Sequence, residues 1–234
     1  MKIIHLVRLR NTPIFKQLQY EEALIRADKR NWCLLNDGST EAIVMGISGK
    51  PEELIDERHL STPIIRRFSG GGTVLIDPNT CFVTLVCNHR DVAASPFPQH
   101  ILNWKGDLLG YEVKENDYVL NGKKFGGNAQ YITKSRWLHH TSLLWDFDLE
   151  KMNVLKLPPK MPIYRERREH GEFLCRLKDI YTNKEELFEK IVQALSTQFI
   201  VKEVSEEECV ACLNLPHRKS TRYEKICRMG PLTS

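Results

Sequence analysis

The sequence predicts an α+β domain built on a mixed, mostly antiparallel sheet flanked by helices. One reason is that apolar runs of strand type occur in consecutive groups, with helical patterns between the groups instead of after every strand. Another is that Asn121-Gly122 stands between the strand-like runs 118–120 and 123–132. Asn-Gly at such a place is a strong signal for an antiparallel hairpin.

Each element has its own local signal. Thr12-Pro13 favours a helix start, because a hydroxyl can cap a helix whose first turn accepts proline. Residues 81–87 form an unbroken β-favouring apolar run, typical of a strand covered on both faces. In order, we expect a strand at 3–7, a helix from Thr12, strands at 32–35 and 42–47 paired across the turn-rich segment 36–39, a helix within 51–60, strands at 73–76 and 81–87, a helix within 97–109, strands at 118–120, 123–132 and 137–147, a solvated loop at 165–171, and a helix that continues from a capping box at 182–185.

The composition is that of an ordinary globular protein. The chain has 234 residues, of which 41% are hydrophobic and 27% charged, and this excludes a disordered or fibrous chain. Its formal net charge of +4 is too small for a dedicated nucleic-acid binder. We expect one catalytic-sized domain over residues 1–200 and a short basic C-terminal extension over residues 201–234.

The cysteines and the N-terminus indicate where the protein works. Seven cysteines, an odd number, are scattered along the chain, and no secretory leader or window of membrane-span length is seen. Reduced thiols inside the cell are the simplest interpretation. We therefore expect a cytoplasmic protein, not secreted and without membrane or nucleic-acid partners, and leave a mitochondrial location open.

A glycine-rich segment is the sharpest chemical feature. Adjacent glycines allow positive φ and let the backbone N–H groups approach an anion, and the arginines before them add donors suited to phosphate or carboxylate. A flexible turn between strands is the alternative. The segment is neither a Walker loop nor a dinucleotide-binding fingerprint. It reads Arg66-Arg67-Phe68-Ser69-Gly70-Gly71-Gly72-Thr73-Val74.

A second segment follows the predicted hairpin turn. Lys123 and Lys124 lie next to each other on a strand, so only one of them can point into an interior site. A lysine aimed at a glycine-lined pocket would stabilise negative charge that grows during a reaction. A solvated hairpin that carries two lysines is the alternative. The segment continues as Phe125-Gly126-Gly127-Asn128-Ala129.

Together the two segments resemble the biotin/lipoate protein ligase superfamily, and most closely the lipoate–protein ligase A family. That family has a double arginine, a residue, Ser or Thr, three glycines and a later aspartate, matched here by residues 66–74 and Asp77. Its lysine motif is matched by residues 122–129, and its His-His pair by His139-His140. The motifs occur in the family order, and the resemblance covers about residues 1–200.

The resemblance implies a class II synthetase-like sheet and a two-step reaction. ATP, with Mg²⁺ as its usual companion, would convert lipoate or octanoate into an acyl-adenylate. The acyl group would then pass to a lysine on the lipoyl domain of a 2-oxoacid dehydrogenase or on a glycine cleavage carrier protein. Lys124 would be the catalytic residue, and the acyl chain would lie under the glycine loop against Val83 or Leu85. Substrate and nucleotide would be bound by Arg66, Arg67, Ser69, Gly70, Gly71, Gly72, Thr73, Val74, Gly127, Asn128, Ala129 and His140, with no resident metal.

Two departures from the family leave alternatives open. The C-terminal accessory domain of better-known ligases has no counterpart here, so a separate accessory chain is one expectation. Ile76 stands where relatives have an imidazole. An octanoyl- or lipoyltransferase that works from a carrier protein without ATP, with Cys175 as the loosely placed nucleophile, is the first alternative. A non-catalytic protein that binds lipoate or a lipoyl domain is the second.

A zinc site in the C-terminal extension is a minor hypothesis. Cys209, Cys212, His217 and Cys227 match no standard zinc-finger spacing. Cys81 and Cys87 lie inside an apolar strand, so we expect them to be inert core residues. The basic residues after position 217 are expected to be solvated or to meet an acidic carrier domain.

Overall fold

The structure is a computed structural model that describes residues 1–56, 62–92, 98–156 and 161–224. Its elements in the described residues are β1 (Lys2–Leu9), α1 (Ile14–Ala27), β2 (Asn31–Asn36), β3 (Ala42–Met45), α2 (Pro51–Leu54), β4 (Ile64–Arg66), β5 (Val74–Ile76), β6 (Thr80–Asn88), α3 (Pro98–Leu109), β7 (Glu112–Lys114), β8 (Asp117–Leu120), β9 (Lys123–Ile132), β10 (Arg136–Leu144), α4 (Leu149–Met152), α5 (His170–Phe173), α6 (Lys184–Ser196), β11 (Phe199–Glu203), α7 (Glu207–Leu213) and β12 (Arg222–Tyr223). Short 3₁₀ turns lie at Ile163–Arg165 and Leu177–Asp179. Among these residues, no helix combines the length and apolarity needed to cross a bilayer.

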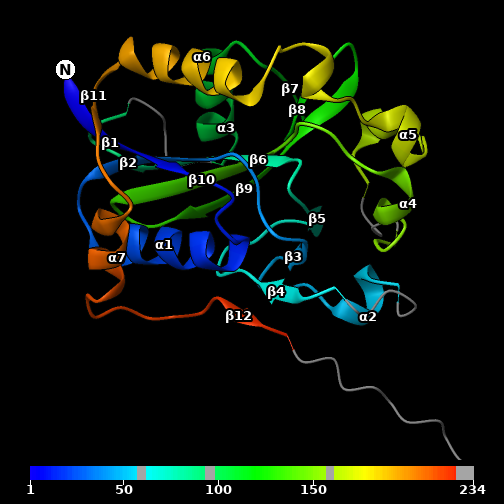
Figure 1. The fold of residues 1–234 in the computed structure, drawn as a ribbon, viewed down its shortest axis with the longest axis horizontal. Helices are drawn as coiled ribbons and strands as arrows, with labels where there is room; N and C mark the ends of the chain where they lie inside the picture. Colours follow the sequence, from blue (N-terminus) through cyan, green and yellow to red (C-terminus); the bar gives the residue numbers. More distant parts are fainter. Residues whose placement is uncertain (57–61, 93–97, 157–160, 225–234) are drawn as a thin grey trace, which may run out of the picture.

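The predicted α+β class is confirmed. The described strands form an eight-stranded sheet in the order β11-β1-β2-β6-β10-β9-β8-β7 and a four-stranded sheet in the order β12-β4-β3-β5. The pairs β1–β11, β1–β2 and β3–β4 are parallel, and the other pairs are antiparallel. In Figure 1, α3 and α6 cover one face of the large sheet, and α1 and α7 cover the other.

Alternation along the strands assigns each side chain to one of these faces. On the face covered by α3 and α6, which we call the α3 face, Leu35, Val83 and Leu143 form a buried core with Leu187. On the face covered by α1 and α7, the α1 face, the buried residues include Leu34, Val86 and Leu138, packed with Leu24. Both faces of β6 are buried, as the apolar run 81–87 predicted.

The small sheet lies against α1, away from the α3 face. Ile14 and Leu18 of α1 pack with Val44 of β3 and with Phe82 of β6. This places the small sheet and its connecting loops on the α1 side of the large sheet (Figure 1). The glycine-rich segment, which joins β4 to β5, therefore lies on that side as well.

The predicted hairpin between residues 32–35 and 42–47 is wrong. β2 pairs with β1 and β6 in the large sheet, whereas β3 pairs with β4 and β5 in the small one. The turn-rich segment between them passes from one sheet to the other. Turn residues show where a strand ends, but they do not show which strand it pairs with.

The hairpin at Asn121-Gly122 is confirmed. β8 and β9 pair antiparallel, and φ is +50° at Asn121 and +74° at Gly122. Two consecutive positive φ values are typical of the turn that Asn-Gly favours. β10 continues the meander, so the three consecutive strands expected here are present.

Several helix ends differ from the predicted ones. α1 begins at Ile14, whose backbone N–H donates to the Ser39 hydroxyl, while the Thr12 hydroxyl caps nothing. α6 is capped one residue later than expected, by the Asn183 side chain. The Thr182 N–H donates to a carboxylate oxygen of Glu186. Of the helix expected within 51–60, the structure has Pro51–Leu54, and residues 57–60 lie outside the described residues.

The segment 165–171, expected as a solvated loop, is partly ordered. Arg165 is 4% exposed and exchanges hydrogen bonds with Arg168, and its guanidinium lies over the Phe173 ring. Both arginines sit above aromatic carbon, which explains why a highly charged stretch packs against the domain.

The chain after residue 200 is tied to the rest of the protein. β11 extends the large sheet beside β1, and α7 packs on α1. Farther along, the N–H groups of Ser220 and Thr221 donate to the buried carboxylate of Glu22 at 2.8 and 2.9 Å. β12 then pairs with β4, the strand that leads into the glycine-rich segment.

Candidate functional site

The glycine-rich loop is held between the small sheet and β9. Its start is fixed by backbone bonds, because Arg67 N–H donates to the Met45 carbonyl and Ile47 N–H donates to the Ser69 carbonyl, both at 2.9 Å. Gly71 has a φ of +100°, and a Cβ there would lie 3.1 Å from the Ala129 Cβ. The loop thus touches the lysine motif, and only glycine fits at its point of contact.

Gly70 and Gly72 differ from Gly71. A Cβ built on either of them meets nothing within 4 Å. The space that a side chain would occupy is therefore open at both positions. Thr73 follows, and its buried hydroxyl has no hydrogen-bond partner among the described residues. Val74 begins β5 opposite Val44 and belongs to the small sheet.

Lys124 lies on the same face of β9 as the glycine loop. Its ammonium is 2.8 Å from a carboxylate oxygen of Asp117, and a Cβ on Gly127 would be 3.5 Å from that ammonium. Gly127 and Ala129 are alternate residues of one strand, roughly 7 Å apart along it. The lysine and the glycine loop therefore meet on the α1 face of β9, one strand repeat apart. Lys123, by contrast, is exposed.

His140 connects the loop to α1. Its Nε2 is 3.1 Å from the Ser69 hydroxyl, and its Nδ1 is 2.7 Å from a carboxylate oxygen of Glu21. Ser69 and Glu21 are both 0% exposed. Arg67 Nε donates to the Ser69 oxygen at 3.1 Å, so the Ser69 hydroxyl joins Arg67 to His140, and the imidazole joins Ser69 to Glu21.

The charge state of this buried chain follows from its partners. Burial alone raises the pKa of Glu21, but the charge and hydrogen bond of His140, with the bonds from Thr84 and Gln17, bring that pKa below its ordinary value. Glu21 is therefore ionised at neutral pH. An anchored carboxylate under His140 holds Ser69, and with it the first residue of the glycine run, in one position.

Neither predicted arginine is open to a ligand. Arg67 is 4% exposed, and its guanidinium donates to the Gly70 carbonyl at 2.6 and 3.1 Å, while burial lowers its pKa to about 10. Arg66 forms an ion pair with Glu224 and donates to the carbonyls of Ile47 and Gly49. Both side chains stabilise the loop and its neighbours.

Asn128 points away from the rest of the predicted site. It pairs with Thr141, whose hydroxyl donates to its side-chain oxygen at 2.6 Å, on the α3 face of the sheet. Val83 and Leu85 also lie on the α3 face, in the core that Leu187 shares. The expectation that they wall an acyl chain under the glycine loop is therefore wrong, because strand alternation turns them to the opposite side.

Three residues of this site, Glu21, Asp117 and Tyr164, were not singled out from the sequence. Glu21 lies in the apolar pattern of α1, and a buried carboxylate there gave no local sign of its partner. Asp117 is 5% exposed and binds both Lys124 and the Tyr164 hydroxyl, each at 2.8 Å. Only the arrangement of β8, β9 and the 163–165 turn in space brings these groups together.

The thiols of the described residues do not form a nucleophilic site. Burial raises the pKa of Cys81 to about 12, and Cys87 is equally enclosed, which confirms both as core residues. Cys175 packs on the α3 side, where burial raises its pKa and its thiol points at the Lys123 carbonyl at 3.5 Å. A raised pKa lowers the thiolate fraction that acyl transfer needs.

Nothing in the described residues indicates a bound metal. They hold no group of three or more His, Cys, Asp or Glu side chains arranged to bind an ion. Cys209 and Cys212 are buried in the α1-face core, and Cys212 contacts Asp28. Cys227 lies outside the described residues, so the zinc hypothesis has no support from the placed ligands.

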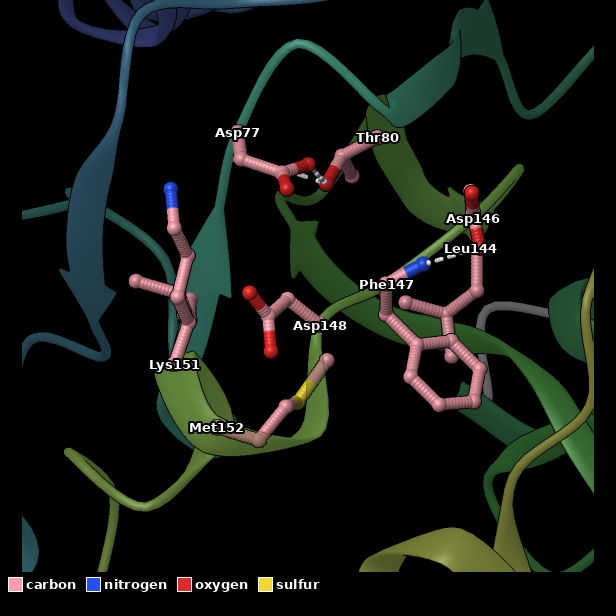
Figure 2. A pocket seen from close by; sticks show the side chains of 9 residues that line it. Asp77, Thr80, Leu144, Asp146, Phe147, Asp148, Lys151 and Met152 are labelled. Carbon is pink, nitrogen blue, oxygen red and sulfur yellow. Dashed lines mark hydrogen bonds between the residues drawn. The ribbon is translucent and has the colours of Figure 1, made fainter.

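A separate small pocket lies near the end of β5 (Figure 2). It is lined by Leu75, Asp77, Thr80, Leu144, Asp146, Phe147, Asp148, Lys151 and Met152. Its carboxylates have structural partners: Asp77 accepts from Thr80, Asp148 caps α4, and Asp146 pairs with Lys178. The pocket contains none of the predicted site residues.

Comparison with known sequences supports the family resemblance of the two motifs. Residues 13–200 match the sequence model of a family described as lipoyl protein ligase A/B catalytic domain. A Plasmodium falciparum protein named inactive lipoate–protein ligase 2 is 27% identical over 257 aligned positions, which cover 78% of this chain and 66% of the relative. The chain thus spans less than two thirds of that relative, and 28% and 25% of the next two matched proteins are covered.

Comparison with solved structures supports the fold. A structure of lipoate–protein ligase A bound with ATP superposes with a TM-score of 0.72 at 16% identity, covering 91% of this chain and 93% of that one. A bipartite lipoate–protein ligase from Thermoplasma acidophilum, described with its E2 lipoyl domain, gives a TM-score of 0.67 at 20% identity, with 91% of both chains covered. The predicted ligase-type fold is therefore confirmed.

Proposed function

The chain belongs to the lipoyl protein ligase A/B family, and on that premise we propose that it attaches a lipoyl or octanoyl group to a lysine of a lipoyl domain after activating the acid with ATP. The observation that carries this proposal is the meeting of Lys124 and the Gly71 loop on one face of β9. A cation and a set of backbone donors on one side of a strand suit a reaction that moves negative charge between the oxygens of a carboxylate and of a neighbouring phosphate.

The chemistry has two displacements. The acid carboxylate attacks the α-phosphorus of ATP and pyrophosphate leaves; the acceptor amine then attacks the acyl carbon and AMP leaves. Lys124 would stabilise the charge on the reacting oxygens in both steps, taking a substrate oxygen beside Asp117 as a further partner. The protein supplies orientation and electrostatic stabilisation, so no covalent nucleophile is needed.

The glycine loop fits a phosphate-bearing ligand. Gly70 and Gly72 leave their backbone unshielded by side chains, and the buried Thr73 hydroxyl has no partner among the described residues. The Thr73 hydroxyl would gain a partner when an anion binds there, and the bare glycines would let that anion approach the backbone. Ser69, Gly71 and His140 would hold the loop in place, and Gly127 and Ala129 would form the floor. Mg²⁺ has no ligand cluster in the described residues, so we derive no step through it.

The proposed acceptor is a lipoyl domain, either of a 2-oxoacid dehydrogenase or of a glycine cleavage carrier protein. The bipartite Thermoplasma relative is described with its E2 lipoyl domain, which supports this class of partner and the use of a separate accessory chain. The basic residues Arg218 and Lys219, before β12, would meet an acidic acceptor.

A second candidate is acyl transfer from an already activated donor, without ATP. Two observations favour it. The Plasmodium relative is named an inactive ligase, and the Arg66 guanidinium is held by Glu224 instead of being open to a phosphate. In this reading Lys124 keeps its role in transfer, because Cys175 lies on the α3 side and has a raised pKa.

One paired experiment tests both candidates. The protein is incubated with lipoate, MgATP and a lipoyl domain, and separately with octanoyl carrier protein and the same domain; pyrophosphate and the mass of the domain are measured. Pyrophosphate release with domain modification supports the ligase, whereas modification only from the octanoyl donor supports the second candidate. A binding-only protein modifies nothing in either reaction.

The lysine assignment is tested by Lys124→Ala, with Lys123→Ala as the matched control. Loss of one preorganised charge-stabilising group costs about 10²- to 10³-fold in kcat. We expect that loss for Lys124→Ala and nearly full activity for Lys123→Ala, because Lys123 is exposed. Equal activity of Lys124→Ala and the unmodified protein would refute the site.

A further inference from the structure

A fully buried lysine lies directly beneath the proposed site, on the other side of the sheet. Lys105 of α3 is 0% exposed, and none of the ion pairs in the described part of the chain includes it. Burying an ammonium without a carboxylate is costly, so its hydrogen bonds must compensate. Its Nζ donates to the Val83 carbonyl at 2.9 Å and the Thr141 hydroxyl at 2.7 Å, and lies 3.2 Å from His139 Nδ1.

While Lys105 is protonated, its bonds have only one possible direction. An ammonium group can only donate, so the Thr141 oxygen accepts from Lys105 and the single Thr141 proton is free for another acceptor. That acceptor is the side-chain oxygen of Asn128, at 2.6 Å. The amide of Asn128 is thereby oriented with its NH₂ group outward, and this group donates to the Asn116 carbonyl at 3.0 Å.

The chain of bonds ends beside Lys124. Asn116 immediately precedes Asp117, whose carboxylate holds the Lys124 ammonium at 2.8 Å. Asn128 stands between Gly127 and Ala129, the two residues whose opposite faces form the floor of the proposed site. The Lys105 network therefore fixes, from the α3 face, the two backbone segments on which the α1-face site is built.

We propose that Lys105 is a positioning residue for acyl transfer: acting through Thr141 and Asn128, it sets the β9 backbone and the Asn116–Asp117 segment that place Lys124. This inference rests on the function proposed above. Lys105 touches no substrate, so its effect is on the rate of the chemical steps and not on the affinity for the acceptor.

The protonation of Lys105 supports this role. Burial lowers its pKa to about 7, and the nearby Cys33, Glu21 and Cys87 oppose that shift. The facing His139 is neutral, since burial and Lys105 hold its pKa well below the ordinary value. A neutral amine has a lone pair that can accept the Thr141 proton, and Asn128 then loses its donor. The positioning should therefore weaken as the pH rises through about 7.

A double-mutant cycle tests the network. Lys105→Met and Thr141→Val each interrupt it, and Thr141→Ser keeps the hydroxyl. For each variant, the single-turnover rate of acyl transfer, the steady-state kcat and KM, and the thermal stability are measured. Ile101→Val in the same helix is the control for loosening of the core, since Ile101 is also 0% exposed. Loss of one net hydrogen bond predicts about a tenfold fall in kcat with KM unchanged.

We expect the double variant to be no slower than either single variant, and Thr141→Ser to restore most of the rate. Multiplicative losses in the double variant, or losses that follow thermal stability as they would for Ile101→Val, would overturn the proposal. If Lys105→Met does not fold, Thr141→Val against Thr141→Ser decides alone.

A structural readout separates this inference from the proposed function. The Asn128 side-chain NH₂ signals are followed by NMR from pH 6 to 9, in the unmodified protein and in Lys105→Met. A titration near the Lys105 pKa that disappears in the variant supports the network even if the protein shows no acyl transfer, an outcome that would remove only the proposed function. The same Asn128 signals in both proteins at every pH would overturn the network itself.

Discussion

Gly71→Ala is the sharpest test of how the glycine loop is built. The residue has a φ of +100°, and an added Cβ would lie 2.7 Å from the Arg67 guanidinium nitrogen and 3.1 Å from the Ala129 Cβ. Arg67 has little freedom to withdraw, because its guanidinium is held by the Gly70 carbonyl. Both the backbone conformation and the contact therefore oppose the substitution.

The magnitude follows from these two terms. A non-glycine residue in so sparsely populated a backbone conformation costs about 1–3 kcal/mol. For a protein of this size, about 1 kcal/mol lowers Tm by roughly 2–4 °C. We expect Gly71→Ala to lower Tm by roughly 4–8 °C at a mid-range cost of about 2 kcal/mol. The loop would also move away from Ala129, so acyl-adenylate formation should fall.

Two neighbours in the same loop provide the matched controls for stability. Gly70 and Gly72 have no positive φ, and a Cβ on either meets nothing within 4 Å. Alanine at these positions should leave Tm nearly unchanged, or raise it slightly by restricting the unfolded chain. Thermal unfolding by circular dichroism compares the three variants. If Gly71→Ala is as stable as Gly70→Ala, the described loop conformation is wrong.

Two other predictions concern stability. The Lys105 pKa of about 7 in the folded state lies below its ordinary 10.5, so between these values the unfolded chain binds more protons and stability should rise with pH by about 1.4 kcal/mol per unit. Urea unfolding at pH 7, 8 and 9 should show this rise, and Lys105→Met should lack it; identical slopes in the two proteins would contradict the lowered pKa of Lys105. Asn183→Ala removes the side-chain oxygen that accepts from the Glu186 N–H at 2.8 Å. The free energy of unfolding should fall by about 1 kcal/mol, seen as a lower Tm. An unchanged Tm would mean that this cap contributes nothing.

Local chemistry explains what could be predicted of the fold. The apolar run 81–87 marks a doubly buried strand, and Asn121-Gly122 marks a hairpin, because both signals depend only on neighbouring residues. Pairing between distant strands does not. Residues 32–35 and 42–47 have clear strand patterns, yet they belong to different sheets, and no local feature distinguishes that arrangement from a hairpin.

The site shows the same division. Its two motifs were recognised from residue types in a fixed order, and the structure brings Gly71 and Lys124 to one face of β9. The partners of the motif residues were not recognised. Arg66 meets Glu224 from the far end of the chain, and His140 meets Glu21 from α1.

The sequence by itself determined the α+β class, the family and the positions of the glycine and lysine motifs, because these depend on residue type, periodicity and spacing. Only the tertiary structure decided which face each side chain occupies and which charges meet. Asn128 turns to the α3 face and joins Lys105 there, although it stands within the lysine motif. Strand alternation and long-range packing, which bring residues far apart in the chain within hydrogen-bond distance, are the physical reason.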